Sequence, residues 1–215
     1  MRKRKGLFVV LEGIDGAGTT TQAKLLHAYL DNRGIRSVIT NEPTDEPVGK
    51  LIRDALSGRV TSPQTGERVE FSEAALCLLF AADRLEHSAA IESQRSRGQA
   101  VVCDRYIHSS IAYQTLDSRI TPQRVIDVNN GCSIPDVTFF LKVPVGQCLK
   151  RLQNRKDVPT VYEKKEFLEN ISRNYEETER LYEKTFGPIV SVDGTASPEN
   201  VHAAIVDGLS GYLID

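Results

Sequence analysis

The chain has 215 residues, of which 40% are hydrophobic and 26% are charged, and its formal net charge is −2. This composition is typical of a globular protein, and the length suits one compact domain of ~100–200 residues. The small net charge excludes a strong field that would attract nucleic acid or an anionic membrane. No apolar run approaches the ~20 residues that span a bilayer, and the four cysteines lack a metal-binding spacing. We therefore expect a cytoplasmic protein with neither nucleic acid nor membrane as a partner.

Apolar runs that suit buried strands alternate with amphipathic stretches that suit helices. Strands are expected at 7–11, 35–40, 100–103, 137–143 and 189–192, and helices at 20–30, 48–57, 71–97, 122–130, 144–154, 164–184 and 198–213. Residues 58–70 are expected to form a surface loop. The alternation predicts an α/β fold with a mostly parallel sheet covered by helices on both faces. Because such sheets bind ligands at the carboxyl ends of their strands, functional residues should follow the first, third and fourth strands.

Residues 13–20 form a glycine-rich loop between the first expected strand and the first expected helix. They are Gly13, Ile14, Asp15, Gly16, Ala17, Gly18, Thr19 and Thr20. Glycines permit a tight turn whose backbone N–H groups, together with the helix N-terminus, face a phosphate group. The spacing matches the phosphate-loop pattern except at Thr19, where the pattern requires lysine. The loop predicts nucleotide binding with Thr20 as a magnesium ligand, but a different cation has to neutralise the phosphates.

Asp104 and Arg105 directly follow the third expected strand. In a doubly wound sheet this carboxylate lies beside the phosphate loop, where it can hold Mg²⁺ directly or through water. The guanidinium of Arg105 can bind a second phosphate group in a bidentate manner. These two residues therefore favour a site for two phosphate-bearing substrates.

Phe80 and Arg84 are four residues apart and share one face of the long helix expected at 71–97. An aromatic ring followed one turn later by a guanidinium can stack on a base and donate to its carbonyl edge. Taken alone, Phe80 is better explained as a core residue than as a base-stacking one, because aromatic side chains on buried helices usually belong to the core.

Several further motifs occur in one order along the chain. They are the loop Gly-Ile-Asp-Gly-Ala-Gly, Glu42-Pro43, Leu-Leu-Phe-Ala-Ala-Asp-Arg at 78–84, Asp104-Arg105-Tyr106 with Ser109, Tyr113-Gln114 and Pro135-Asp136. Together they resemble the thymidylate kinases of the nucleoside monophosphate kinases, in the bacterial type, over nearly the whole chain. The resemblance implies one domain over residues 1–215, with the three-layer α/β/α phosphate-loop NTPase fold, a five-stranded parallel sheet and a short lid at about 151–163.

The same resemblance implies ATP and Mg²⁺ as phosphoryl donor and cofactor, dTMP as acceptor, and a homodimer built on the long helices. It assigns substrate binding to Arg53, Phe80, Arg84, Arg105, Ser109, Tyr113 and Gln114. Within this set Phe80 stacks on thymine, Arg84 faces its carbonyl edge, and Arg53 and Arg105 hold the acceptor phosphate. Tyr113 lies against the deoxyribose, where a 2′-hydroxyl would clash. Asp15 contacts the acceptor, Asp104 serves the metal with Thr20, and Glu42-Pro43 is a turn with a cis peptide bond.

Two positions depart from the family pattern. Thr19 replaces the loop lysine, and Val161 replaces the basic residue that precedes Tyr-Glu in the lid. Phosphoryl transfer depends on charge neutralisation, so the loss of both cations requires a substitute. Arg151 and Arg155, one helical turn apart, are the candidates, and with Asp15 and Arg105 they complete the predicted catalytic set. Alternatively, these two arginines form a solvated helix end.

The leading hypothesis is a dTMP kinase whose lid arginines replace the loop lysine. One alternative is a kinase of another pyrimidine nucleotide. A second alternative is a catalytically weak or silent nucleotide-binding protein that kept the fold and lost the cations. Tyr113 and Arg84 favour thymidylate over cytidylate, and the intact Asp104-Arg105 pair argues against a decayed enzyme.

Overall fold

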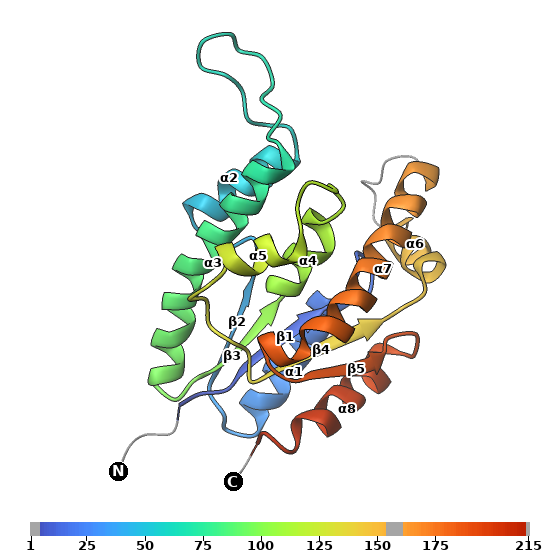
Figure 1. Ribbon diagram of the computed structural model, residues 1–215. Helices are drawn as coiled ribbons and strands as arrows, with labels where there is room; N and C mark the ends of the chain where they lie inside the picture. The colour runs from blue at the N-terminus through green and yellow to red at the C-terminus, as the bar shows by residue number, and fades with distance from the viewer. Residues whose placement is uncertain (1–4, 154–160, 214–215) are drawn as a thin grey trace.

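A computed structural model describes residues 5–153 and 161–213 and contains one five-stranded parallel sheet (Figure 1). The strands are β1 (Phe8–Glu12), β2 (Ser37–Asn41), β3 (Ala100–Asp104), β4 (Val137–Lys142) and β5 (Ile189–Asp193). Their order in the sheet is β2-β3-β1-β4-β5, and every neighbouring pair is parallel. The predicted five-stranded parallel sheet is therefore confirmed, and each strand boundary lies within two residues of its expected place.

Helices cover both faces of the sheet, as expected. They are α1 (Thr19–Asn32), α2 (Pro47–Leu56), α3 (Glu73–Ser96), α4 (Ile107–Gln114), α5 (Pro122–Val128), α6 (Val145–Gln153), α7 (Val161–Phe186) and α8 (Pro198–Leu209). Helices α1 and α8 pack together on one face, whereas α3, α4 and α7 lie on the other (Figure 1). Helix α4 is absent from the elements expected from the sequence, because its eight residues are too few for a clear periodic signal.

Side chains of β1 alternate between the two faces of the sheet. Phe8 and Val10 pack with the apolar residues of α3 and α4, and Val9 and Leu11 pack with those of α1 and α8. All four are fully buried. A strand buried on both faces reads as one continuous apolar run, which is why the sequence predicted β1 so clearly.

The carboxyl ends of the three strands β2, β3 and β1 meet at one edge of the sheet. The amide of Arg105 donates to the carbonyl of Leu11 at 2.9 Å, and the amide of Glu42 donates to the carbonyl of Asp104 at 3.1 Å. The peptide bond between Glu42 and Pro43 is cis, as the resemblance implied. The segments that follow these three strands are therefore held side by side, so the residues expected to form the site lie at this edge of the sheet.

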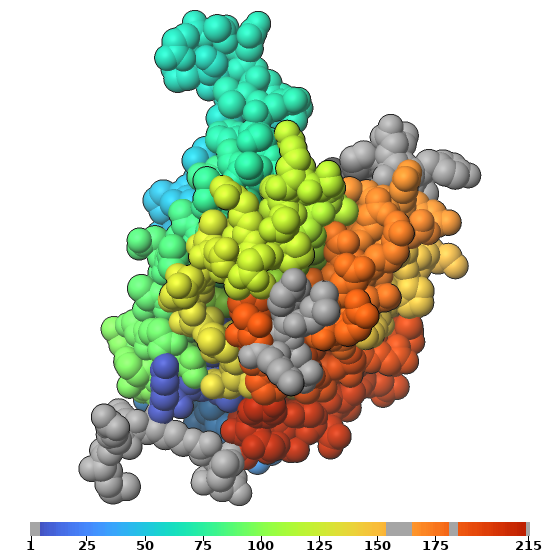
Figure 2. Space-filling view, viewed as in Figure 1, coloured from blue at the N-terminus to red at the C-terminus, as the bar shows by residue number. Residues whose placement is uncertain are grey.

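The connection between α2 and α3, residues 57–72, extends away from the body of the molecule (Figures 1 and 2). Thr61 and Arg68 form an isolated antiparallel bridge within it, and the amide of Ser62 donates to the carbonyl of Glu67 at 2.8 Å. The predicted surface loop is thus a hairpin-like arm that pairs with itself. Within the residues that the structure covers, no helix is both long enough and apolar enough to cross a membrane.

Two helical glycines differ in what surrounds them and provide a test of the fold. A Cβ atom at Gly49 in α2 would overlap the backbone of Thr44, whereas a Cβ atom at Gly146 in α6 would meet nothing within 4 Å. Gly49→Ala should therefore lower the free energy of unfolding by ~1–3 kcal/mol, the typical cost of overpacking. Gly146→Ala, the control, should raise it by up to ~1 kcal/mol through helix propensity. Urea unfolding followed by circular dichroism measures both, and equal effects would contradict the packing of α2 on residue 44.

Candidate active site

The phosphate loop runs from Gly13 to Gly18 and leads directly into α1. Gly18 adopts the left-handed conformation, with φ of 103°, and no side chain caps the helix there. Gly16 is also left-handed, at 88°, and a Cβ atom on it would lie 2.8 Å from the carbonyl oxygen of Cys148. The turn thus requires glycine, and the uncapped N–H groups at the start of α1 can accept an anion.

Arg151 places a positive charge beside this loop, whereas Thr19 brings none. Nη1 of Arg151 donates to the carbonyl of Ala17 at 3.1 Å and more weakly to that of Gly16 at 3.4 Å. Its Nη2 donates to the carbonyl of Gly194 at 2.9 Å. These bonds fix the guanidinium at the outer end of the loop, beside a cavity of about 280 Å³ that it helps to line. The other predicted lid cation, Arg155, lies outside the described residues.

Thr20 and Asp104 meet as the sequence predicted for a magnesium site. The hydroxyl of Thr20 donates to Oδ2 of Asp104 at 2.5 Å. The other carboxylate oxygen of Asp104 is buried and has no hydrogen-bond partner among the described residues. Those residues contain no group of three or more His, Cys, Asp and Glu that could hold a metal ion. A hydroxyl and one carboxylate nevertheless fit Mg²⁺ in a phosphate-loop site, because the nucleotide and water supply its remaining oxygen ligands.

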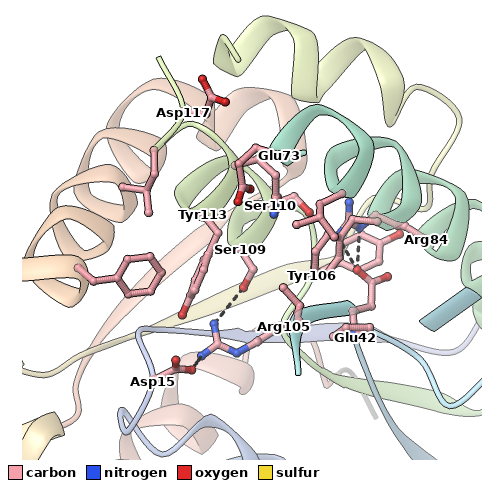
Figure 3. A pocket seen from close by; sticks show the side chains of 17 residues that line it. Asp15, Glu42, Glu73, Arg84, Arg105, Tyr106, Ser109, Ser110, Tyr113 and Asp117 are labelled. Carbon is pink, nitrogen blue, oxygen red and sulfur yellow. Dashed lines mark hydrogen bonds and ion pairs between the residues drawn. The ribbon is translucent and has the colours of Figure 1, made fainter. Parts of the chain in front are cut away.

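A larger cavity of about 580 Å³ opens over the ends of β1, β2 and β3, between α3, α4 and α7 (Figure 3). Six of the predicted substrate-binding residues line it, together with Asp15: Phe80, Arg84, Arg105, Ser109, Tyr113 and Gln114. Arg53 does not line the cavity. Its Nη1 donates to the carbonyl of Pro43 at 2.7 Å, and Pro43 lies in the cavity wall, so Arg53 is close to the edge of the cavity.

Arg84 is fully buried, and its guanidinium donates hydrogen bonds to three side chains of the protein. Nε donates to Glu42 at 2.8 Å, Nη1 to the side-chain oxygen of Asn129 at 2.6 Å, and Nη2 to Ser110 at 2.9 Å. The guanidinium also lies 5.2 Å from the ring centroid of Tyr106. Nη2 also lies 2.6 Å from Oε2 of Glu42, so these contacts engage four of the five N–H groups of an arginine. Arg84 is therefore a rigid part of the cavity wall with one N–H group of Nη1 left to donate.

Arg105 lies between the cavity and the phosphate loop (Figure 3). Nη2 donates to Asp15 at 2.8 Å, and Nη1 donates to the hydroxyls of Ser109 and Tyr175 at 3.3 and 3.2 Å. Its φ of 68° is the one positive value among the described residues other than glycine. Such backbone conformations persist only where the surroundings impose them, and they cluster at functional sites.

Tyr113 and Gln114 bring polar groups into the cavity that have no partner within the described part of the chain. The hydroxyl of Tyr113 and the side-chain oxygen of Gln114 are both buried without a hydrogen bond. Burial raises the pKa of Tyr113 to about 12, so its hydroxyl remains a donor at neutral pH. Because an unpaired buried polar group is costly, these two groups favour a polar ligand in the cavity.

Three side chains of the site are not predicted from the sequence. Glu12 and Tyr175 are not among the expected site residues, and Glu42 is expected only as part of a turn. Glu12 ends β1, is fully buried and binds the start of α4, and burial raises its pKa. Its signal was a carboxylate at the end of a buried strand, directly before the phosphate loop. Glu42 was assigned only a turn, although its side chain pairs with both Arg84 and His87. Tyr175 has no local signal, since it occupies an ordinary position in the amphipathic helix α7.

Comparisons with known proteins identify relatives over nearly the full length. The family model "Thymidylate kinase" matches residues 11–205. A probable thymidylate kinase of Methanococcus aeolicus is 37% identical over 204 residues, which are 94% of this chain and 95% of that protein. That of Thermococcus kodakarensis is 38% identical over 202 residues, 93% and 95% of the two chains. That of Methanocaldococcus jannaschii is 37% identical over 208 residues, 96% and 95%. These relatives are archaeal, so the bacterial type expected from the motifs is not supported.

Proposed function

Since this chain belongs to the thymidylate kinase family, we propose that it transfers the terminal phosphoryl group of ATP to dTMP and releases dTDP. The donor binds on residues 13–20, and the acceptor binds in the 580 Å³ cavity. The observation that supports this arrangement most strongly is the position of Arg105, whose guanidinium contacts both the phosphate-loop carboxylate of Asp15 and the cavity residue Ser109.

The walls of the cavity suit a thymine nucleotide. Phe80 offers a ring for stacking, and Arg84 offers an N–H group that can only donate. A carbonyl at the 4-position of the base would satisfy such a donor, whereas the amino group of cytosine would oppose it. The unpartnered oxygen of Gln114 and hydroxyl of Tyr113 add an acceptor and a donor for the nucleoside. Arg105 binds the acceptor phosphate, assisted by Arg53 from the cavity edge.

The donor side needs a cation in place of the loop lysine. We assign this role to Arg151, with Arg155 as its partner from the lid. The guanidinium of Arg151 already lies against the loop, 3.1 Å from the carbonyl of Ala17. A cation held there by backbone carbonyls requires little reorganisation during phosphoryl transfer, and such preorganised charge is the main source of catalysis in this reaction.

Thr20 and Asp104 would hold Mg²⁺, which neutralises the charge of the donor phosphates when it is bound. The residues of the chain do the remaining work. Arg105, which donates to Asp15, holds the acceptor phosphate near the donor, and the apolar cavity walls keep water away from the reacting groups. Exclusion of water favours transfer to dTMP over hydrolysis of ATP.

We further propose that two copies of the chain associate through α2 and α3. Leu51 on α2 is 36% exposed, and Leu78 and Leu85 on α3 are 50% and 42% exposed. Leu78 and Leu85 are seven residues apart and therefore share one helix face. Helices α2 and α3 pack on each other, so Leu51 lies on the helix next to the one that carries the other two leucines. An apolar surface of this kind on a folded chain favours a protein partner.

The first prediction concerns the acceptor. The wild type should prefer dTMP over dCMP by ~10³-fold or more in kcat/KM, and over UMP clearly but less steeply, because a mismatched polar edge leaves buried groups unpaired.

Phe80→Leu removes the stacking surface and should lower kcat/KM for dTMP by about tenfold. Phe71→Leu, which lies outside the cavity lining, is the control. Coupled assays with each monophosphate measure this. Comparable turnover of dCMP and dTMP would instead favour the kinase of another pyrimidine nucleotide.

The second prediction concerns the missing lysine. Arg151→Ala, Arg155→Ala or the double variant should lower kcat by ~10²-fold while dTMP binding persists, as expected for loss of a transition-state cation. Lys150→Ala, on an exposed neighbouring position of α6, is the control and should be neutral. Thr19→Lys should remain active, with the KM for ATP changed by tenfold or less, ~1.4 kcal/mol.

Two results would contradict this assignment. Unchanged kcat in both single variants and in the double variant would exclude the arginines as replacements for the lysine. An inactive wild type that gains turnover on Thr19→Lys would show that the chain is a silent nucleotide-binding protein.

The third prediction concerns association. Light scattering should give a mass of twice the 23.9 kDa of one chain for the wild type. The double variant Leu78→Glu with Leu85→Glu should be monomeric, because charges at an apolar interface lose their hydration without gaining partners. Ala203→Glu places the same charge on an exposed position of α8 and should remain dimeric. A monomeric wild type at micromolar concentration would exclude the proposed dimer.

A further inference from the structure

The carboxylate of Glu12 joins parts of the site that come from different segments of the chain. It is fully buried at the end of β1. Oε1 accepts from the amides of Tyr106 and Ser109 at 2.8 and 3.1 Å, which are N–H groups at the start of α4 without helical partners. Glu12 therefore caps the helix that carries Ser109, Tyr113 and Gln114, and its negative charge suits the positive end of that helix.

The second oxygen of Glu12 connects helix α7 to the same point. Oε2 accepts from the hydroxyl of Ser109 at 2.6 Å and from the hydroxyl of Tyr175 at 3.0 Å. The two hydroxyls are 2.7 Å apart. The ring of Tyr175 packs edge-on against Phe140 with centroids 5.5 Å apart, so β4 also fixes its direction. One carboxylate thus holds α4 and α7 together beneath the cavity.

The two hydroxyls in turn receive hydrogen bonds from Arg105. Nη1 of Arg105 donates to both, at 3.3 Å for Ser109 and 3.2 Å for Tyr175. The hydrogen-bond direction therefore runs from the guanidinium through the hydroxyls to the carboxylate of Glu12, which can only accept when ionised. Arg105 is oriented by this chain of bonds on one side and by Asp15 on the other.

We propose that Glu12 and Tyr175 are positioning residues, which hold Arg105 in place for the acceptor phosphate and couple helix α7 to the acceptor cavity. The inference rests on the proposed function, because it takes the phosphate of dTMP as the ligand of Arg105. Neither side chain needs to touch the substrate. Their contribution is to orient a cation that would otherwise have several rotamers, and such orientation is lost when one bond of the network is removed.

The variant Tyr175→Phe tests the proposal because it removes one hydroxyl and keeps the ring packing. Its dissociation constant and KM for dTMP should rise about tenfold, the usual effect of losing a hydrogen bond to a charged group, and the KM for ATP should change less than twofold. Tyr29→Phe is the matched control: Tyr29 lies on α1, outside the cavity lining, and among the described residues its hydroxyl bonds only to Arg33. A variant that is only less stable would contain less active protein, but its KM for dTMP would not rise more than its KM for ATP.

Amide hydrogen exchange measures the coupling directly. In the wild type, dTMP should slow exchange both in α4 and in the part of α7 around residue 175. In Tyr175→Phe the slowing should be confined to α4. Glu12→Gln places an amide donor against the amides of Tyr106 and Ser109, so it should weaken dTMP binding further. If that variant fails to fold, the result for Tyr175→Phe stands by itself.

The outcomes separate this inference from the proposed function. A wild type that phosphorylates dTMP, together with a Tyr175→Phe variant that matches it within twofold in dTMP affinity and in α7 protection, would overturn the positioning role alone. A wild type that neither binds nor phosphorylates dTMP would overturn the acceptor assignment. The coupling between α7 and α4 would then be measured by amide hydrogen exchange in the protein without ligand. Tyr175→Phe should speed exchange at the start of α4 by about fivefold or more. Unchanged exchange rates would overturn the coupling as well.

Discussion

Burial of the Glu12 carboxyl group at the end of β1 constrains the whole active site. A carboxylate without water is stable only when hydrogen-bond donors surround it, and Glu12 receives them from α4 and α7. The elements that supply these donors also bear the walls of the acceptor cavity. Tyr113 and Gln114 follow Ser109 along α4, and Arg105 precedes it. The geometry of the cavity therefore depends on a group that is not exposed to it.

Charge distribution around the phosphate loop is a second constraint, and it differs from the usual phosphate-loop arrangement. A lysine in the loop would approach the phosphates from the loop itself. Here the cation belongs to α6, and backbone carbonyls on two separate segments hold it: Ala17 in the loop and Gly194 after β5. The position of Arg151 thus depends on how α6 and the end of β5 pack against the loop. Under the role proposed for Arg151, charge neutralisation is a property of tertiary structure, whereas a loop lysine would provide it locally.

The fold could be predicted from the sequence because its determinants are local. Continuous apolar runs such as that of β1 and amphipathic periods such as that of α7 specify strands and helices over short distances. The glycine positions of the phosphate loop and the pair Asp104 and Arg105 were visible for the same reason. Helix α4 was missed because its eight residues are short for a periodic signal and contain Ser, Tyr and Gln rather than a clear apolar face.

The network beneath the cavity could not be predicted in this way, since its partners are far apart in the sequence. Glu12 and Tyr175 are separated by 163 positions, and the packing of α7 on α4 and of Tyr175 on Phe140 of β4 brings them together. Arg84 shows the same limit. Its place on a helix face beside Phe80 followed from spacing, but its pairing with Glu42 and Asn129 depended on the turn after β2 and on the end of α5.

The arm between α2 and α3 can change in length at its tip without altering the active site. Leu56 and Glu73 flank it at either end and line the acceptor cavity, yet the pairing of Thr61 with Arg68 closes the arm before its tip. Residues between these two positions can therefore change in number without moving the cavity walls, and each doubling of such a loop costs only ~0.6 kcal/mol in closure entropy. The tip, at Gln64 and Thr65, is accordingly a suitable place to insert an epitope or a fluorescent label.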